Sequence, residues 1–351
     1  MNKNNNFDFL RFLFAIFVVI SHSYPLSGGH ESTQWIYQTT NGQVVLARLG
    51  LDGFFIISGF FIFQSLKRSK SLFSYYKKRF LRLFPALFVV LLLTIILAPF
   101  VYEGELPFFK NHQVYTYLPN NLSLYGFQPT IKGIFDNNPY HSINGSLWTI
   151  RYEFSLYIVL SCLYFFRKSI LVKKNLLLFC FILLVVMNNF FMDRFAGSKI
   201  FGLNGYETLD LGTFFVCGSL LASFEFEKIN KKRIMLLVTF LIIVTSIYLN
   251  FYANVKHIIL PIIILLIGFM PLPVFSDFGK IGDMSYGIYI YSFPVQQTLM
   301  YFYKLSVFQL MFWSVLVSIV FGYLSWHLIE KKALKYKNKP LFKNWKLLFS
   351  H

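Results

Sequence analysis

Long apolar stretches, separated by shorter polar or basic segments, repeat along the whole chain. Several of them approach or exceed the roughly 18–20 residues that an α-helix needs to cross a bilayer. The pattern predicts an all-α fold, a polytopic membrane bundle of about 10 transmembrane helices. The predicted helices span residues 7–24, 45–66, 83–102, 147–166, 176–191, 209–224, 234–252, 257–270, 285–303 and 308–329. The stretch 257–270 is short and contains Pro261, which leaves a re-entrant segment as an alternative.

Lysine and arginine are distributed unevenly between the connections. They crowd the segments 67–82, 167–174 and 228–233 and the end of the chain, whereas the alternate connections hold few. Positive residues favour the cytoplasmic side, so both termini are predicted to be cytoplasmic and the number of helices even. We predict a transmembrane domain over residues 1–332 and a basic cytoplasmic tail over residues 333–351.

The composition agrees with a membrane protein. Hydrophobic residues make up 56% of the chain and charged residues 14%, whereas a soluble domain carries about a quarter charged residues. The net charge of +18 follows from the membrane topology, and the basic residues form no contiguous soluble module that would bind nucleic acid. The three cysteines lie inside apolar stretches without metal-ligand spacing, so no metal is expected.

The first apolar stretch carries two polar residues on one helical face. Arg11 and His22 are ~1100° apart around a helix, about 20° from three full turns, and roughly 16 Å apart along its axis. Polar side chains inside a spanning helix usually face a bundle interior or a wet cavity. A neutral imidazole can take a proton from a hydroxyl. A structural histidine at the helix end, or an Arg11 that snorkels to the interface, is the alternative.

Two further segments carry charged residues at a predicted membrane boundary. Asp52 lies at the start of the second predicted helix, where it could orient a histidine or stabilise the helix N-terminus. Arg79 and Arg82 are three residues apart, and Pro85 suits the beginning of the third helix. Arginine binds phosphate in a bidentate manner, which predicts a phosphate-bearing donor on the cytoplasmic side. Membrane topology alone is the alternative.

The remaining candidates come from the later helices. Arg151 and Glu153 lie inside the predicted helix 147–166 and could form a paired polar site, or a structural ion pair. Glu330 lies at the inner end of the last helix, where it could face Arg79 or Arg82, or remain solvated. The polar and aromatic segment 103–146 could form a lid over an acceptor, or an ordered plug.

Taken together, these motifs resemble the acyltransferase-3 family of bacterial integral membrane O-acyltransferases. The similarity extends over nearly the whole chain and in the order of the family. The matching motifs are the Arg-x10-His spacing at 11 and 22, LDGFFIISGFF, RFLRLFP, GSLWTIRYE, SYGIYIYSFP and SWHLIEK. Many members have a histidine where this chain has Ser292, so any role of that histidine does not transfer.

The resemblance implies transfer of an acyl group, usually acetyl, from cytoplasmic acyl-coenzyme A to a sugar hydroxyl. It assigns the Arg-x10-His signature to Arg11 and His22 and the Arg-x-x-Arg signature to Arg79 and Arg82. The acids of the other motifs match Asp52, Glu153 and Glu330. Many members also carry a hydrolase-like domain outside the membrane. This chain is therefore expected to pass the acyl group to the acceptor itself or through a separate partner.

We therefore predict an O-acyltransferase of the bacterial inner membrane that uses acetyl-CoA as co-substrate and modifies an envelope glycan or lipid-linked saccharide. In this interpretation Arg79 and Arg82 hold the phosphates of coenzyme A. His22 acts as the base, and Arg11 fixes charge in the same cavity. Either Asp52 or Glu153 sets the tautomer of the histidine. The alternatives are a lipid-linked glycan transporter or flippase without transfer activity, and an interaction subunit with an inactive site.

Overall fold

The computed structural model describes residues 5–338, and the described chain is almost entirely helical. Ten of its helices have 14 residues or more and correspond in position to the ten predicted helices. They are α1 (Phe7–Leu26), α3 (Leu46–Arg68), α4 (Leu72–Leu97), α6 (Trp148–Ser161), α7 (Ile170–Phe190), α9 (Gly205–Ser223), α10 (Lys232–Tyr248), α11 (Tyr252–Phe269), α13 (Ser285–Tyr303) and α14 (Val307–Ser325).

Shorter elements connect these helices. The short α-helices are α2 (Trp35–Thr39), α5 (His112–Leu122), α8 (Met192–Phe195), α12 (Pro273–Ser276) and α15 (Lys331–Leu334). The 3₁₀ turns are η1 (Glu31–Thr33), η2 (Ala98–Val101), η3 (Phe108–Lys110), η4 (Gly145–Leu147), η5 (Cys162–Phe166), η6 (Phe226–Lys228) and η7 (Asp277–Lys280). A π-helical turn, η8 (Trp326–Glu330), follows α14, and β1 (Lys199–Ile200) pairs antiparallel with β2 (Leu203–Asn204).

Within the described residues, six helical stretches are long and apolar enough to cross a membrane. They are Phe7–Leu26, Leu46–Arg68, Leu72–Val101, Ile170–Phe190, Tyr252–Phe269 and Val307–Leu334. The chain is therefore a multi-pass helical membrane protein. The prediction of about 10 spans and of two cytoplasmic termini stays a prediction. Tyr252–Phe269 is longer than the sequence pattern suggested and qualifies as a full span despite Pro261.

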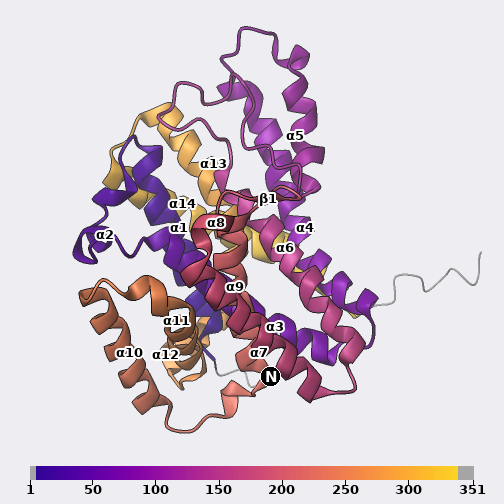
Figure 1. The fold of residues 1–351 in the computed structure, drawn as a ribbon. Helices are drawn as coiled ribbons and strands as arrows, with labels where there is room; N and C mark the ends of the chain where they lie inside the picture. The colour runs from indigo at the N-terminus through magenta and orange to yellow at the C-terminus, as the bar shows by residue number, and fades with distance from the viewer. Residues whose placement is uncertain (1–4, 339–351) are drawn as a thin grey trace, which may run out of the picture.

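Helix α3 lies at the centre of the bundle, between α1 and α9 (Figure 1). Its glycines permit this close approach. A Cβ on Gly53 would lie 2.2 Å from the ring of Phe14 on α1, and one on Gly59 would lie 2.0 Å from the backbone oxygen of Phe215 on α9. Small residues of this kind let membrane helices pack backbone to backbone. By contrast, α7 and α10 expose most of their apolar side chains on the periphery, where a bilayer would cover them.

The start of α4 differs from the prediction. Residues 67–82 were predicted as a connector, but α4 already begins at Leu72, after Ser71 accepts a hydrogen bond from the backbone nitrogen of Ser74. This N-cap lets the basic segment continue as helix. Pro85 therefore lies inside α4 and not at its beginning. Of the predicted tail 333–351, residues 339–351 lie outside the described residues, as does Lys3 of the basic N-terminus.

The α3–α9 contact gives a first test of the packing. We expect Gly59→Ala to lower the free energy of unfolding by about 1–3 kcal/mol, because the new methyl group would overlap backbone that cannot move aside cheaply. Gly212→Ala on α9 is the matched control, since its Cβ would meet only Leu156, at 3.9 Å. The midpoint of thermal unfolding in detergent is measured for both variants and compared with that of the wild-type protein. Equal midpoints for the two variants would contradict the close approach.

Candidate active site

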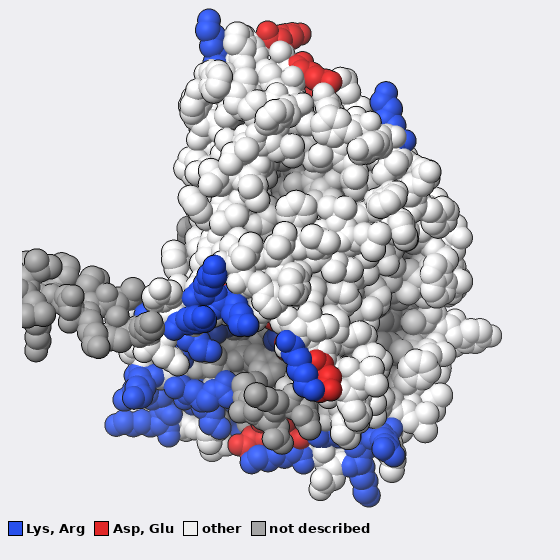
Figure 2. Space-filling view, turned by 180° about the vertical axis from the view of Figure 1, so that it is seen from behind, with Lys and Arg blue, Asp and Glu red and all other residues white. Residues whose placement is uncertain are grey.

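A large cavity opens at the end of the bundle where lysine and arginine gather. Its volume is about 910 Å³, within the usual ligand range of roughly 300–1,000 Å³. Figure 2 shows the basic residues concentrated toward one end of the molecule, below a broad uncharged belt. Helices α1, α3 and α4 and the segment before α13 form most of the wall. The cationic side chains that line it are Arg11, Arg68, Lys78, Arg79, Arg82, Lys280 and Lys337.

Arg82 is held by two carboxylates in this cavity. Its guanidinium donates to Asp283 at 2.6 Å and to Glu330 at 3.0 Å. Glu330 is 1% exposed and also accepts from Ser325 at 2.9 Å. The π-helical turn η8 accounts for this placement, because the extra residue turns Glu330 inward, and such turns are frequent at functional sites. The expectation that Glu330 faces one of the two arginines is thus confirmed.

Two further arginines of the cavity, Arg11 and Arg79, are held less firmly than Arg82. Arg11 lies 3.2 Å from Asp8 and 3.7 Å from Asp283. Arg79 has no ion pair within the described part of the chain. It contacts the Ser65 hydroxyl at 3.5 Å, and its guanidinium carbon lies 5.8 Å from the Tyr157 ring centroid. An unpaired guanidinium beside a paired one is suited to bind a phosphate group of a ligand.

The charge state of Asp283, which contacts Arg82 and Arg11, is set by its neighbours. Asp283 lies outside the spanning helices, in the turn before α13. Burial disfavours its charged form, but the guanidinium groups of Arg82 and Arg11 outweigh burial, so the pKa of Asp283 is below its usual value. The Ser285 hydroxyl, which donates to Asp283 at 2.6 Å, acts in the same direction. Asp283 is therefore an anion at neutral pH and fixes the two arginines.

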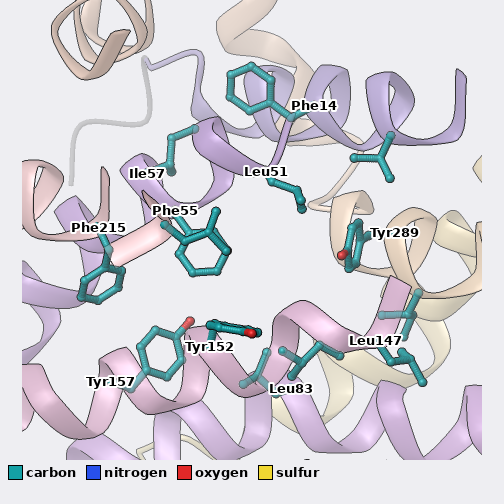
Figure 3. Close-up of a cluster of buried hydrophobic side chains, with 14 of the residues drawn as sticks. Phe14, Leu51, Phe55, Ile57, Leu83, Leu147, Tyr152, Tyr157, Phe215 and Tyr289 are labelled. Atoms are coloured by element: carbon teal, nitrogen blue, oxygen red, sulfur yellow. The ribbon is translucent and has the colours of Figure 1, made fainter. Parts of the chain in front are cut away.

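A second, narrower cavity of about 160 Å³ continues from the first into the bundle. The two cavities share Arg11, Arg79, Arg82, Asp283 and Phe61 in their linings. Figure 3 shows side chains of its wall, with Leu51, Phe55, Leu83, Tyr157 and Tyr289 around one space. The charged entrance is therefore joined to an apolar and aromatic interior, a combination that can take a ligand with a charged head and a slender apolar arm.

A hydrogen-bonded group of three side chains lies in the wall of the second cavity. The Ser58 hydroxyl donates to Glu153 at 2.9 Å and lies 3.2 Å from the Tyr157 hydroxyl, which also donates to Glu153. Glu153 comes from α6 and Ser58 from α3. This group can exchange protons with a ligand in the cavity.

A hydrogen-bonded tyrosine on α13 forms part of the wall of the second cavity. The Tyr289 hydroxyl donates to the backbone oxygen of Ser146 at 2.7 Å and lies 2.7 Å from the Thr149 hydroxyl. Both Tyr289 and Thr149 line the cavity. Phe293 lies one turn beyond Tyr289 on α13, and the ring of His22 packs edge-on against Phe293 with 5.4 Å between centroids.

His22 is therefore placed next to the cavity wall and does not line either cavity. Its Nδ1 atom is buried, and no described residue hydrogen-bonds to it. Arg11 contacts Asp283, just before α13, and His22 contacts Phe293 on α13. Both side chains thus face the same neighbouring segment, in agreement with the predicted common face of α1.

The structure does not bring Asp52 or Glu153 to His22. Asp52 was predicted at the start of its helix, but it lies inside α3 and is buried. Its carboxylate lies 3.5 Å from the guanidinium of Arg48, which precedes it by one helical turn. Glu153 pairs with Ser58 and Tyr157. Arg151 points away from Glu153, with its guanidinium over the rings of Tyr152 and Phe127. The predicted pairing of Arg151 with Glu153 is therefore wrong, because residues two apart lie on opposite faces of a helix.

The sequence analysis missed a second charged cluster around Arg48. Arg48 contacts Glu207 at 2.5 Å and also pairs with Asp210. Asp210 receives two further contacts at 2.7 Å, from Lys256 and from His257. These residues come from α3, α9 and α11, each at the end opposite the arginine-lined cavity. Each is a charged or titratable residue inside or beside an apolar stretch, the signal that drew attention to Arg11 and His22.

Comparison with known proteins agrees with this architecture. Residues 4–328 match the acyltransferase domain of the acyltransferase-3 family, so the chain belongs to that family of membrane acyltransferases. Over 341 residues it is 28% identical to an O-acetyl transferase of Shigella phage Sf6, covering 95% of this chain and 97% of the relative. Over 174 residues it is 30% identical to nodulation protein 10 of Rhizobium leguminosarum bv. viciae, covering 45% of this chain and 44% of the relative.

No solved structure gives a significant match to this chain. The family and the named relative identify an acyltransferase whose helices lie in a membrane, and they do not favour the transporter alternative. The two cavities share an arginine-containing wall, and His22 is in neither lining.

Proposed function

We propose that the protein transfers an acyl group, in the first instance acetyl, from cytoplasmic acyl-CoA to a hydroxyl of an envelope glycan or lipid-linked saccharide at the bacterial inner membrane. One observation carries this proposal. A cavity lined by arginines opens at the lysine-rich end of the bundle and continues toward the opposite end. The lysine-rich end is cytoplasmic under the positive-inside rule.

Arg79 and Arg82 would hold the phosphates of the donor. The site fits such a group, because the cationic lining exceeds the carboxylates that neutralise it and Arg79 has no ion pair among residues 5–338. Glu330 and Asp283 position Arg82 in advance, so that little side-chain conformational freedom is lost on binding. The narrow second cavity would take the slender arm that carries the acyl group.

His22 would serve as the base for transfer. The oxygen of the acceptor hydroxyl bonds to the acyl carbon while the carbon–sulfur bond of the thioester breaks. The hydroxyl proton passes to His22 and then to the departing sulfur, so protons and charge balance. Movement of Phe293, which packs against His22, and of Tyr289, which lines the second cavity one turn away on α13, would join the cavity to His22. Arg11 would stabilise negative charge at the inner end of the same helix face.

The two remaining acids take different places in this proposal. Glu153, with Ser58 and Tyr157, would keep the wall of the second cavity polar at one point and assist proton movement there. Asp52 would act through the Arg48 cluster and not on the acyl group, because its ion-pair partner is Arg48. The transmembrane unit would comprise residues 1–332, with a basic cytoplasmic tail over residues 333–351.

The donor site is tested by Arg79→Ala in membranes supplied with radiolabelled acetyl-CoA. Loss of one charge-assisted contact of about 1.5–3 kcal/mol should raise the KM for acetyl-CoA about 10-fold or more, with a smaller change in kcat. Arg167→Ala is the matched control, because Arg167 is exposed on the same basic end but does not line the cavity. An unchanged KM in Arg79→Ala would refute this donor site.

A further inference from the structure

An open groove of about 410 Å³ lies at the end of the bundle opposite the arginine-lined cavity. It is formed by the first turns of α6 and α9 and by the segment between α8 and α9. Its lining combines three aromatic residues, two charged residues and an amide: Trp148, Tyr152, Tyr206, Arg151, Glu207 and Asn204, together with Ala196. None of these residues lines the donor cavities.

Helix α6 separates this groove from the second donor cavity. Thr149 and Glu153 line the cavity, whereas Trp148, Arg151 and Tyr152 line the groove. The helix therefore has one face toward the donor path and another toward the groove. This arrangement makes the groove a separate binding surface, on another face of α6 from the proposed donor path.

Arg151 is the unbalanced charge in the groove. Its guanidinium lies 5.3 Å from the Tyr152 ring centroid and 5.6 Å from that of Phe127, and no carboxylate in the described range 5–338 pairs with it. Its Nε atom is buried without a hydrogen-bond partner. Glu207 cannot neutralise it, because that carboxylate is engaged by Arg48 at 2.5 Å. An arginine within a membrane helix calls for a partner or an anionic ligand.

The rest of the groove suits a sugar ring. Aromatic rings offer flat apolar faces to the C–H groups of a sugar, while amide and charged groups at the edge meet its hydroxyls. Tyr206 is 40% exposed and therefore available, and Trp148 packs edge-on against Tyr152 with 5.4 Å between centroids. The lining thus offers a ring platform beside a cation.

The groove also opens toward an apolar strip. Ile158 on α6 and Cys162, the first residue of η5, follow Arg151 by seven and eleven residues, which places them on nearly the same helical face. Ile158 is 42% exposed, the adjacent Val159 is 65% exposed and Cys162 is also exposed. A lipid chain can lie along this strip while a polar head occupies the groove above it.

We propose that this groove binds the anionic saccharide head of a membrane-anchored acceptor, with Arg151 contacting its carboxylate or phosphate oxygens. This inference rests on the proposed function, in which the acceptor is an envelope glycan or lipid-linked saccharide. It adds the place where that acceptor binds and the negative charge that it carries next to the sugar. The bidentate geometry of a guanidinium suits either anionic group.

The test measures ligand binding to the full-length protein in lipid nanodiscs by calorimetry. One pair of probes is a glucuronate-containing hexasaccharide and its methyl ester. The other is a C10 polyprenyl diphosphate disaccharide and the uncharged C10 polyprenyl disaccharide. We expect the wild-type protein to bind at least one anionic probe more tightly than its neutral counterpart. Arg151→Gln should lower the affinity for that anionic probe at least 10-fold. The pair that shows the effect identifies carboxylate or phosphate.

Two control variants keep the result interpretable. Arg194→Gln, on α8 outside the groove lining, should change affinity less than twofold. Tyr206→Ala should lower the affinity for charged and neutral probes alike, because it removes an aromatic ring that would contact the sugar and leaves the guanidinium of Arg151 in place. The proposal is overturned if wild type shows no preference for either anionic probe, or if Arg151→Gln binds as wild type does. Binding is measured without acyl donor, so absence of acyl transfer would count against the proposed function and not against the groove.

Discussion

His22→Ala is expected to reduce acyl transfer by about 10²–10⁴-fold, the usual contribution of a general base. The buried Nδ1 atom has no hydrogen-bond partner among the described residues, and the ring is fixed against Phe293. The substitution removes the group proposed to accept the hydroxyl proton and leaves the arginine-lined cavity intact. The KM for acetyl-CoA should therefore stay close to the wild-type value while kcat falls.

The measurement is transfer of radiolabelled acetyl from acetyl-CoA into envelope glycans in isolated membranes. His30→Ala is the matched control, because His30 lies just after the same helix and is exposed. It should retain wild-type activity. If His22→Ala keeps more than half of the wild-type kcat, the base lies elsewhere, and Glu153, in the wall of the second cavity, becomes the next candidate.

The contact between a cavity arginine and Glu330 could be anticipated because its signals are local. Arg79 and Arg82 precede one predicted helix and Glu330 follows another, so the positive-inside pattern places all three on one side of the membrane. This was enough to expect that Glu330 could face Arg79 or Arg82, and in the structure it lies 3.0 Å from Arg82. Asp283 was missed, although it joins Arg82 to Arg11, because it lies in a turn with no periodic pattern.

Other features depend on how helices far apart in sequence pack together. Hydrophobic periodicity predicts that a helix exists, but not which neighbour each of its faces meets. The packing of His22 on α1 against Phe293 on α13 is of this kind. So is the start of α4, where the Ser71 cap and the packed face of the helix outweigh a run of basic residues that looked like a connector.

The Arg48 cluster shows the same limit, and it also has the clearest consequence for stability. Its acids and bases come from three helices, and each charged residue alone could be attributed to a membrane boundary. In the structure Arg48 is the common partner of Asp52, Glu207 and Asp210. The cluster therefore ties α3 to α9 at the end opposite the donor cavity, and through Lys256 it reaches α11.

Arg48→Met is expected to lower the free energy of unfolding by about 3–5 kcal/mol, because it leaves the buried carboxylate of Asp52 without its ion-pair partner and that of Asp210 with only Lys256 and His257. Asp52 and Asp210 are each 1% exposed, so water cannot replace the lost guanidinium. Unfolding of the purified protein in detergent, followed by tryptophan fluorescence, measures the change. Arg167→Met, which removes an exposed arginine, is the control and should shift stability by less than about 0.5 kcal/mol.

The double variant Arg48→Met with Asp210→Asn separates two contributions to the loss of stability. One is the loss of the ion pairs of Arg48, and the other is the buried negative charge that Arg48→Met leaves on Asp210. If the cost of Arg48→Met comes from the carboxylates that it leaves behind, neutralising Asp210 in addition should cost less than the sum of the two single substitutions. Strict additivity would mean that Arg48 acts independently of Asp210. A loss below about 1 kcal/mol for Arg48→Met alone would show that the cluster does not hold α3 against α9, and the close approach at Gly59 would then be the main contact between them.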